Sequence, residues 1–207
     1  MTAQDTFTAA ARAFTGLVET VPADRLSAPG LGEWTVRDLI GHTVSAGLAA
    51  VADGLGRPAA TEDLTTPESY YALARTAGPD VLEAAVAASA ADAGAWGARL
   101  GERPADHVRP LADRAVAAVA AAGPDALVTT AGGGMRLACW LPTRTFELVV
   151  HGMDVANATG ARLGLPVDVL AEAAGLAARL AAVTGDGRRV LLALTGRSGL
   201  PEGFSVV

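Results

Sequence analysis

The stretch from 145 to 160, TFELVVHGMDVANATG, places charged side chains within an otherwise apolar segment. Successive residues of an α-helix turn by about 100°, so Arg144, Glu147, His151 and Asp154 would form one narrow stripe. The positions around this stripe are nearly all apolar, which is typical of a buried helix. Other elements must surround such a helix, and a helical bundle does this.

Proline and glycine divide the rest of the chain into segments of helical length. Phe7, Phe14 and Leu17 recur at roughly helical spacing, which predicts an amphipathic helix over the first twenty residues. First-turn prolines and glycines that follow the last turn mark most of the other helices. These are expected at about 36–55, 79–100, 110–122, 142–158 and 166–183, with a polar interruption at 61–69 and a loop or short extended segment at 128–138.

The clearest helix start lies at Thr35. Its hydroxyl is a good N-cap, and Asp38 stands three residues later, where the acid of a capping box belongs. Trp34 and Leu39 flank this start at the spacing of a hydrophobic staple. The helix that begins here carries His42, which is one of three histidines in the chain.

These elements predict a mainly α protein. Residues 1–160 are expected to form a four-helix bundle. Residues 161–207 are expected to form a short C-terminal extension, with one helix followed by a β-hairpin. The strands of this hairpin would be RRVLLALTGR and GFSVV, separated by a turn at Ser198 and Gly199.

Composition narrows the classes of partner and location. A net charge of −6 and a pI of about 5.0 argue against a nucleic-acid partner, which normally requires a basic patch. No apolar run approaches the roughly 18 residues of a membrane helix, and the N-terminus lacks the features of a signal peptide. The single cysteine, Cys139, is consistent with a reducing compartment. We therefore expect a cytoplasmic protein without a membrane or nucleic-acid partner.

The buried stripe has two interpretations. A carboxylate buried without compensation costs several kcal/mol, so either Arg144 and His151 form a salt-bridge ladder with Glu147 and Asp154, or a cation binds. If two bundle helices face each other, His42 would complete a His₂Glu set with Glu147 and His151. Such a set has the ligand count of a catalytic zinc site with an open position. Asp154 would then orient His151 through its other ring nitrogen, or act as an extra ligand.

The segments GEWTVRDLIGH and RTFELVVHGMDVANATG together resemble the DinB-like metal-binding superfamily. More narrowly, the chain resembles the mycothiol-dependent maleylpyruvate isomerase-like proteins. That family pairs a Trp-Thr/Ser-Val-x-Asp-Leu-x-x-His segment with a later Glu-x-x-x-His-x-x-Asp segment, and both occur here.

The resemblance implies a DinB-like four-helix bundle that binds a divalent metal, usually zinc, through His42, Glu147 and His151. It also implies that a low-molecular-weight thiol, mycothiol, serves as cosubstrate in isomerisation or S-transfer on a small electrophile. Arg144 is a candidate contact for a substrate carboxylate, or it braces Glu147. Arg197 is a candidate anion contact toward the thiol cofactor, or an exposed arginine at the end of a strand.

Two other functions share this set of residues. One is a DinB-like metal-dependent hydrolase, in which water takes the place of the thiol. The other is a non-catalytic bundle that the metal stabilises and that binds a small ligand or a protein.

Overall fold

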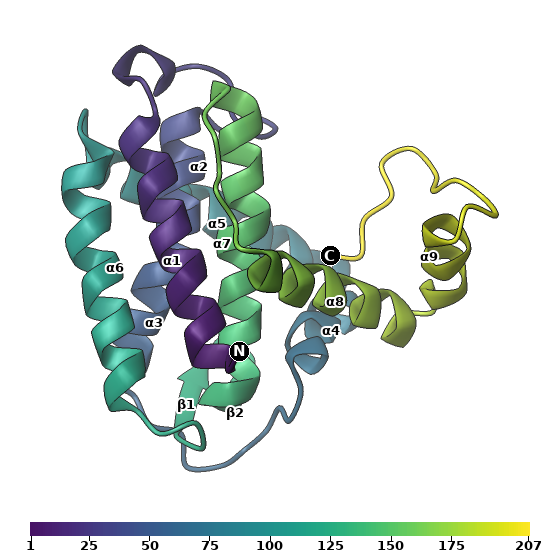
Figure 1. The fold of residues 1–207 in the computed structure, drawn as a ribbon. Coiled ribbons are helices and arrows are strands. Elements are labelled where there is room, and N and C mark those ends of the chain that lie inside the picture. Colours follow the sequence, from purple (N-terminus) through teal and green to yellow (C-terminus); the bar gives the residue numbers. More distant parts are fainter.

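We describe a computed structural model of the chain, which covers residues 1–207 except for the side chains of residues 75 and 76. Four helical segments stand side by side (Figure 1) and confirm the predicted bundle. Each contacts two neighbours in a closed ring. In ring order, the segments are α1 (Ala3–Thr20), α7 (Leu137–Thr159), the run of α2 (Val36–Thr43), η2 (Val44–Ala49) and α3 (Ala50–Gly54), and α6 (Pro104–Ala121).

The other helices cover this bundle. Helix α5 (Pro79–Leu100) packs along α2, and α4 (Pro67–Thr76) contacts α7. A short 3₁₀ turn, η1 (Ala23–Arg25), connects α1 to α2. Helix α8 (Val167–Val183) contacts α1, α4 and α7, while α9 (Gly187–Leu194) packs on α8 and lies apart from the bundle (Figure 1). Among the described residues, no helix is both long and apolar enough to cross a membrane.

The predicted helix at 36–55 is confirmed, with one difference in its middle. Its N-terminus has the expected capping box, because Thr35 Oγ1 accepts from the Asp38 N–H at 3.2 Å and Asp38 Oδ2 accepts from the Thr35 N–H at 3.1 Å. The six residues of η2 are a π-helix. Short π-helical turns inside α-helices are rare and are frequent at functional sites.

Two glycines allow the helices around His42 to approach closely. A Cβ atom on Gly41 would lie 2.5 Å from the backbone nitrogen of Gly97 on α5. A Cβ atom on Gly47 would lie 2.6 Å from Cδ2 of Leu148 on α7. A larger residue at Gly41 would therefore push α2 away from α5, whereas one at Gly47 would have to displace the buried side chain of Leu148.

Two helix starts were predicted too late along the chain. Helix α7 begins at Leu137 rather than at Pro142, because Leu137, Trp140 and Leu141 are buried in the core. The first N–H groups of α7 also have partners, since Leu137 donates to the carbonyl of Ala126 and Ala138 to that of Pro124. Pro142 therefore lies inside the helix.

Helix α6 likewise begins at Pro104 rather than at Pro110. Its first turns bury Pro104 and Val108. This burial favours helix on both sides of Pro110, although a proline in a helix interior removes one backbone hydrogen bond.

The predicted C-terminal β-hairpin is wrong. Residues 187–194 form α9, and residues 204–207 have no regular structure. A strand needs a partner for its backbone groups, whereas a helix pairs its own. Val190, Leu191 and Leu194 also stand at helical spacing.

The hairpin of this protein lies at the segment that was predicted as a loop or short extended stretch. Strands β1 (Leu127–Thr130) and β2 (Gly133–Arg136) pair in antiparallel register, with Val128 opposite Met135. The connection before α4 runs along this hairpin, because the Thr129 N–H donates to the Arg57 carbonyl and the Leu64 N–H to that of Gly134.

Candidate metal centre

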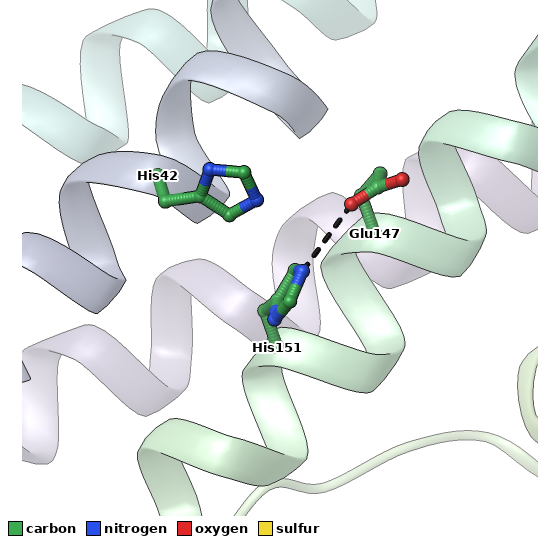
Figure 2. A group of neighbouring side chains, drawn as sticks. All are labelled: His42, Glu147 and His151. Carbon is green, nitrogen blue, oxygen red and sulfur yellow. Dashed lines mark ion pairs between the residues drawn. The ribbon is translucent and has the colours of Figure 1, made fainter. Parts of the chain in front are cut away.

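The facing helices α2 and α7 bring His42, Glu147 and His151 together. His42 comes from the last turn of α2, and the other two residues come from consecutive turns of α7. Figure 2 shows the three side chains pointing toward one another across the space between the helices. One donor atom from each residue can be chosen so that all three lie within 4.8 Å of one another.

This donor set fits a divalent cation. Two donors that each lie 2.0–2.2 Å from a tetrahedral zinc ion are about 3.3–3.6 Å apart, so a pair that is 4.8 Å apart would close by slightly more than about 1 Å around a bound ion. Two imidazoles and one carboxylate are also the ligand types of catalytic zinc sites, which leave a position open for another molecule.

His151 lies between two carboxylates. Its Nδ1 atom is 3.1 Å from Oδ2 of Asp154, and its Nε2 atom is 3.4 Å from Oε2 of Glu147. Burial alone would lower the pKa of His151, but the hydrogen bonds to Asp154 and Glu147 raise it to about 9. Without a cation, an imidazolium therefore joins the two acids, as the salt-bridge interpretation expects.

His42 is turned toward His151 by its neighbours. Its Nδ1 atom lies 3.4 Å from the Ser89 hydroxyl on α5, and its ring lies 4.8 Å from that of Trp34, centre to centre. The His42 and His151 rings are 4.7 Å apart and nearly perpendicular. Burial, together with the positive charge of His151, lowers the pKa of His42. His42 is therefore neutral near pH 7, which is the form that binds metals.

Glu147 is held as a carboxylate. Burial would raise its pKa, but the hydrogen bond from His151 and the charge of Arg144 outweigh this effect and lower the pKa to about 2. The Tyr71 hydroxyl on α4 donates to Oε1 of Glu147 at 2.8 Å. The same Tyr71 hydroxyl lies 3.1 Å from the carbonyl oxygen of Thr143.

Arg144 is buried beside this carboxylate, with 5% of its surface exposed. Its Nη1 donates to the carbonyl of Ala46 in the π-helix at 2.9 Å, and its Nε donates to Oγ1 of Thr143 at 3.0 Å. Its Nη2 lies 4.0 Å from Oε1 of Glu147, which agrees with the bracing role. The predicted contact of Arg144 with a substrate carboxylate stays a prediction.

Arg197 is not brought to this centre. It follows α9, and its exposed guanidinium donates to the carbonyl of Thr195 two residues earlier. Among the described residues, its hydrogen bonds do not reach the side chains around His42 and Glu147.

Sequence reasoning missed Tyr71, because residue 71 lies between the polar interruption at 61–69 and the helix expected from 79, in a stretch that was assigned to no element. The sequence nevertheless contains a signal for the start of the helix that carries Tyr71. Thr66 caps α4 by accepting from the Ser69 N–H, and Pro67 stands in the first turn of that helix. Ser89 and the Ala46 carbonyl had no comparable signal, since their roles depend on how the helices pack.

The fold and the centre define a helical bundle with a candidate His₂Glu metal site between two facing helices. Residues 7–156, well over half of the chain, match the family described as the mycothiol maleylpyruvate isomerase N-terminal domain. The chain belongs to this family, which confirms the resemblance seen in the sequence. Comparisons with curated proteins and with solved structures gave no significant match.

Proposed function

We propose that this protein is a zinc-dependent enzyme that uses a low-molecular-weight thiol, mycothiol, for isomerisation or S-transfer on a small electrophile. The observation that carries the proposal is the convergence of His42, Glu147 and His151 within 4.8 Å between two bundle helices. Membership of a family named for a mycothiol-dependent isomerase supports the choice of thiol. A cytoplasmic location is part of the proposal, because a thiol cosubstrate must stay reduced.

The residues of the centre would divide the work of holding the cation. His42 and His151 would each offer a ring nitrogen, and Glu147 would offer a carboxylate oxygen whose charge Tyr71 and Arg144 stabilise. Asp154 would keep His151 in the orientation that leaves Nε2 facing the centre. A divalent cation with an open position lowers the pKa of a bound thiol, so that a nucleophile forms near neutral pH.

The proposal is tested first by metal content. Protein purified without chelator and supplied with zinc should contain about one zinc ion per chain, measured by elemental mass spectrometry. His42→Ala and His151→Ala should lose this ion. His107→Ala should keep it, because the third histidine is exposed on α6. The site would be refuted if all three variants kept their zinc. It would also be refuted if the unmodified protein bound no zinc.

The second test is thiol dependence of turnover. The zinc-loaded protein should convert a small electrophile, beginning with maleylpyruvate, only when mycothiol is added. His151→Ala should abolish this activity, and His107→Ala should retain it. Hydrolysis of an ester or amide without any thiol would instead identify a metal-dependent hydrolase. A metal-loaded protein without either activity across such a panel would favour a binding role.

A further inference from the structure

Helix α5 turns a single hydroxyl group toward the candidate centre. Over residues 79–92 of this helix, every residue is exposed except Ser89, which is half-buried. Ser89 is also the only residue of α5 with a hydroxyl group. Its Oγ atom lies 3.4 Å from Nδ1 of His42 on the facing helix α2. The inward side chain of this exposed stretch therefore meets a candidate metal ligand.

The Ser89 hydroxyl is not used by its own helix. Serine and threonine side chains inside helices often bond to the carbonyl four residues earlier, and Thr15 and Thr43 do so in this protein at 2.8 and 2.7 Å. Ser89 makes no such bond, and among the described residues its side chain has His42 as its only hydrogen-bond partner. The hydroxyl is therefore available to the imidazole ring as an acceptor or a donor.

Two other contacts hold α2 and the π-helix against α5. A Cβ atom on Gly41 would lie 2.6 Å from the carbonyl oxygen of Ala93, so the two backbones touch at this point. The Ser45 hydroxyl donates to Oδ2 of Asp92. Neither contact involves the ring of His42, so α5 is held beside α2 independently of that ring.

The contact with Ser89 distinguishes the two nitrogens of the His42 ring. Nδ1 faces Ser89, so Nε2 is the nitrogen that remains for a cation. In Figure 2, one ring nitrogen of His42 points toward Glu147 and His151, and the other points away from them. A neutral imidazole carries one proton, and only the other nitrogen can bind a metal. A proton on Nδ1 therefore leaves the lone pair of Nε2 directed at the centre.

We propose that Ser89 is the positioning residue of His42, with its hydroxyl accepting from Nδ1–H so that Nε2 is the ligand atom. The inference rests on the metal site of the proposed function and adds a residue from a third helix to it. Asp154 holds Nδ1 of His151 in the corresponding way. Such outer partners fix the orientation of metal-binding histidines. The hydroxyl of Ser89 is neutral, so its effect should be smaller than that of the Asp154 carboxylate.

The first test measures the zinc affinity of the full chain by competition with a chromophoric chelator. Ser89→Ala should bind zinc about 10-fold more weakly than the unmodified protein, which is the lower end of the range for such partners. Ser89→Thr keeps the hydroxyl and should recover most of the affinity. Ser45→Ala is the matched control, because it removes a serine hydroxyl that joins the same helices without touching His42. This control should bind zinc normally.

The second test observes the His42 ring directly, so that positioning is separated from a general loss of stability. Nitrogen NMR of protein labelled with ¹⁵N-histidine shows which ring nitrogen carries the proton, and His42→Ala assigns the signals. In metal-free protein near pH 7, we expect the Nδ1–H form of His42 to predominate. Ser89→Ala should increase the share of the Nε2–H form, whereas Ser89→Thr and Ser45→Ala should leave the unmodified pattern.

Four results would overturn this inference. Ser89→Ala could bind zinc as tightly as the unmodified protein, or lose no more affinity than Ser45→Ala. Ser89→Thr could fail to recover any affinity, or the proton distribution on His42 could be the same with and without the hydroxyl. An unmodified chain that binds no zinc would refute the proposed function instead. The metal-free NMR comparison would then still decide whether Ser89 holds Nδ1 of His42.

Discussion

Nδ1 of His151 lies 3.1 Å from Oδ2 of Asp154, one turn later on α7, while Nε2 of the same ring faces Glu147. The carboxylate of Asp154 therefore determines which ring nitrogen remains for the centre. Carboxylates that orient metal-binding histidines in this way also increase the basicity of the ligand.

Replacing Asp154 should consequently weaken zinc binding without removing a ligand. We expect Asp154→Asn to lower zinc affinity by about 10- to 100-fold, measured by competition with a chromophoric chelator. Glu83→Gln, which neutralises an exposed acid on α5, is the matched control and should bind zinc normally. An unchanged affinity in Asp154→Asn would mean that Asp154 does not support the ligand.

The hydroxyl of Tyr71 should stabilise the buried Glu147 carboxylate. In metal-free protein, Tyr71→Phe should lower the free energy of unfolding by about 1.5–3 kcal/mol, because the donor of a hydrogen bond to a charged group is lost. Urea denaturation measures this change. Tyr70→Phe keeps the ring that faces Arg144 and should change stability by less than about 0.5 kcal/mol. Equal stability of both variants would show that the contact with Glu147 contributes nothing.

The pKa of His151 predicts how the stability of metal-free protein depends on pH. Its value of about 9 exceeds the ordinary 6.5, so the folded state holds this proton more tightly than the unfolded state. The resulting stabilisation is complete below pH 6.5 and is lost as the pH rises through 9. The difference between the two pKa values corresponds to about 3 kcal/mol of folding free energy. Stability measured by urea denaturation should therefore fall across this range, and less so in His151→Gln.

The same proton should be released when zinc binds. His151 must lose it to become a ligand, whereas the pKa of His42 is lowered and this residue is already neutral. Zinc affinity should then rise about tenfold per pH unit between 6.5 and 9. Calorimetry in buffers of different ionisation enthalpy should count one proton released per zinc at pH 7.5. No release, or a flat affinity over this range, would contradict the assignment of His151 as a ligand.

The close approach of α2 and α5 can be tested with a pair of glycines. Gly41→Ala would put a methyl group 2.5 Å from the backbone nitrogen of Gly97, so it should destabilise the fold by about 1–3 kcal/mol. It should also weaken zinc binding, because His42 is the next residue. Gly94→Ala on α5 meets no atom within 4 Å and should be neutral or stabilising by up to about 1 kcal/mol. Thermal denaturation compares the two, and a Gly41→Ala protein as stable as the Gly94→Ala protein would argue against this packing.

Local patterns were sufficient for much of the fold and for the composition of the site. The capping box at Thr35 and Asp38 involves neighbours in the sequence, so it needs no information about the rest of the chain. The spacing of Glu147, His151 and Asp154 places them on one face of any α-helix, so their relation was also predictable. The place of His42 on the helix that starts at Thr35 was also predictable, because it follows this clear start at a short distance along the chain.

Tertiary structure decided what the local patterns left open. Residues 187–194 form a helix, since the residues that follow α9 do not form a partner strand. Helix α7 begins before Pro142 because its first residues pack in the core and because its first N–H groups donate to carbonyls just before the hairpin. The contact of Tyr71 with Glu147 joins residues 76 positions apart, and the Arg144 contact with Ala46 spans 98. Such contacts depend on how closely glycines such as Gly41 and Gly47 let the helices pack. The sequence by itself therefore determined which side chains share a helix face, and only the packing of the helices decided which faces meet.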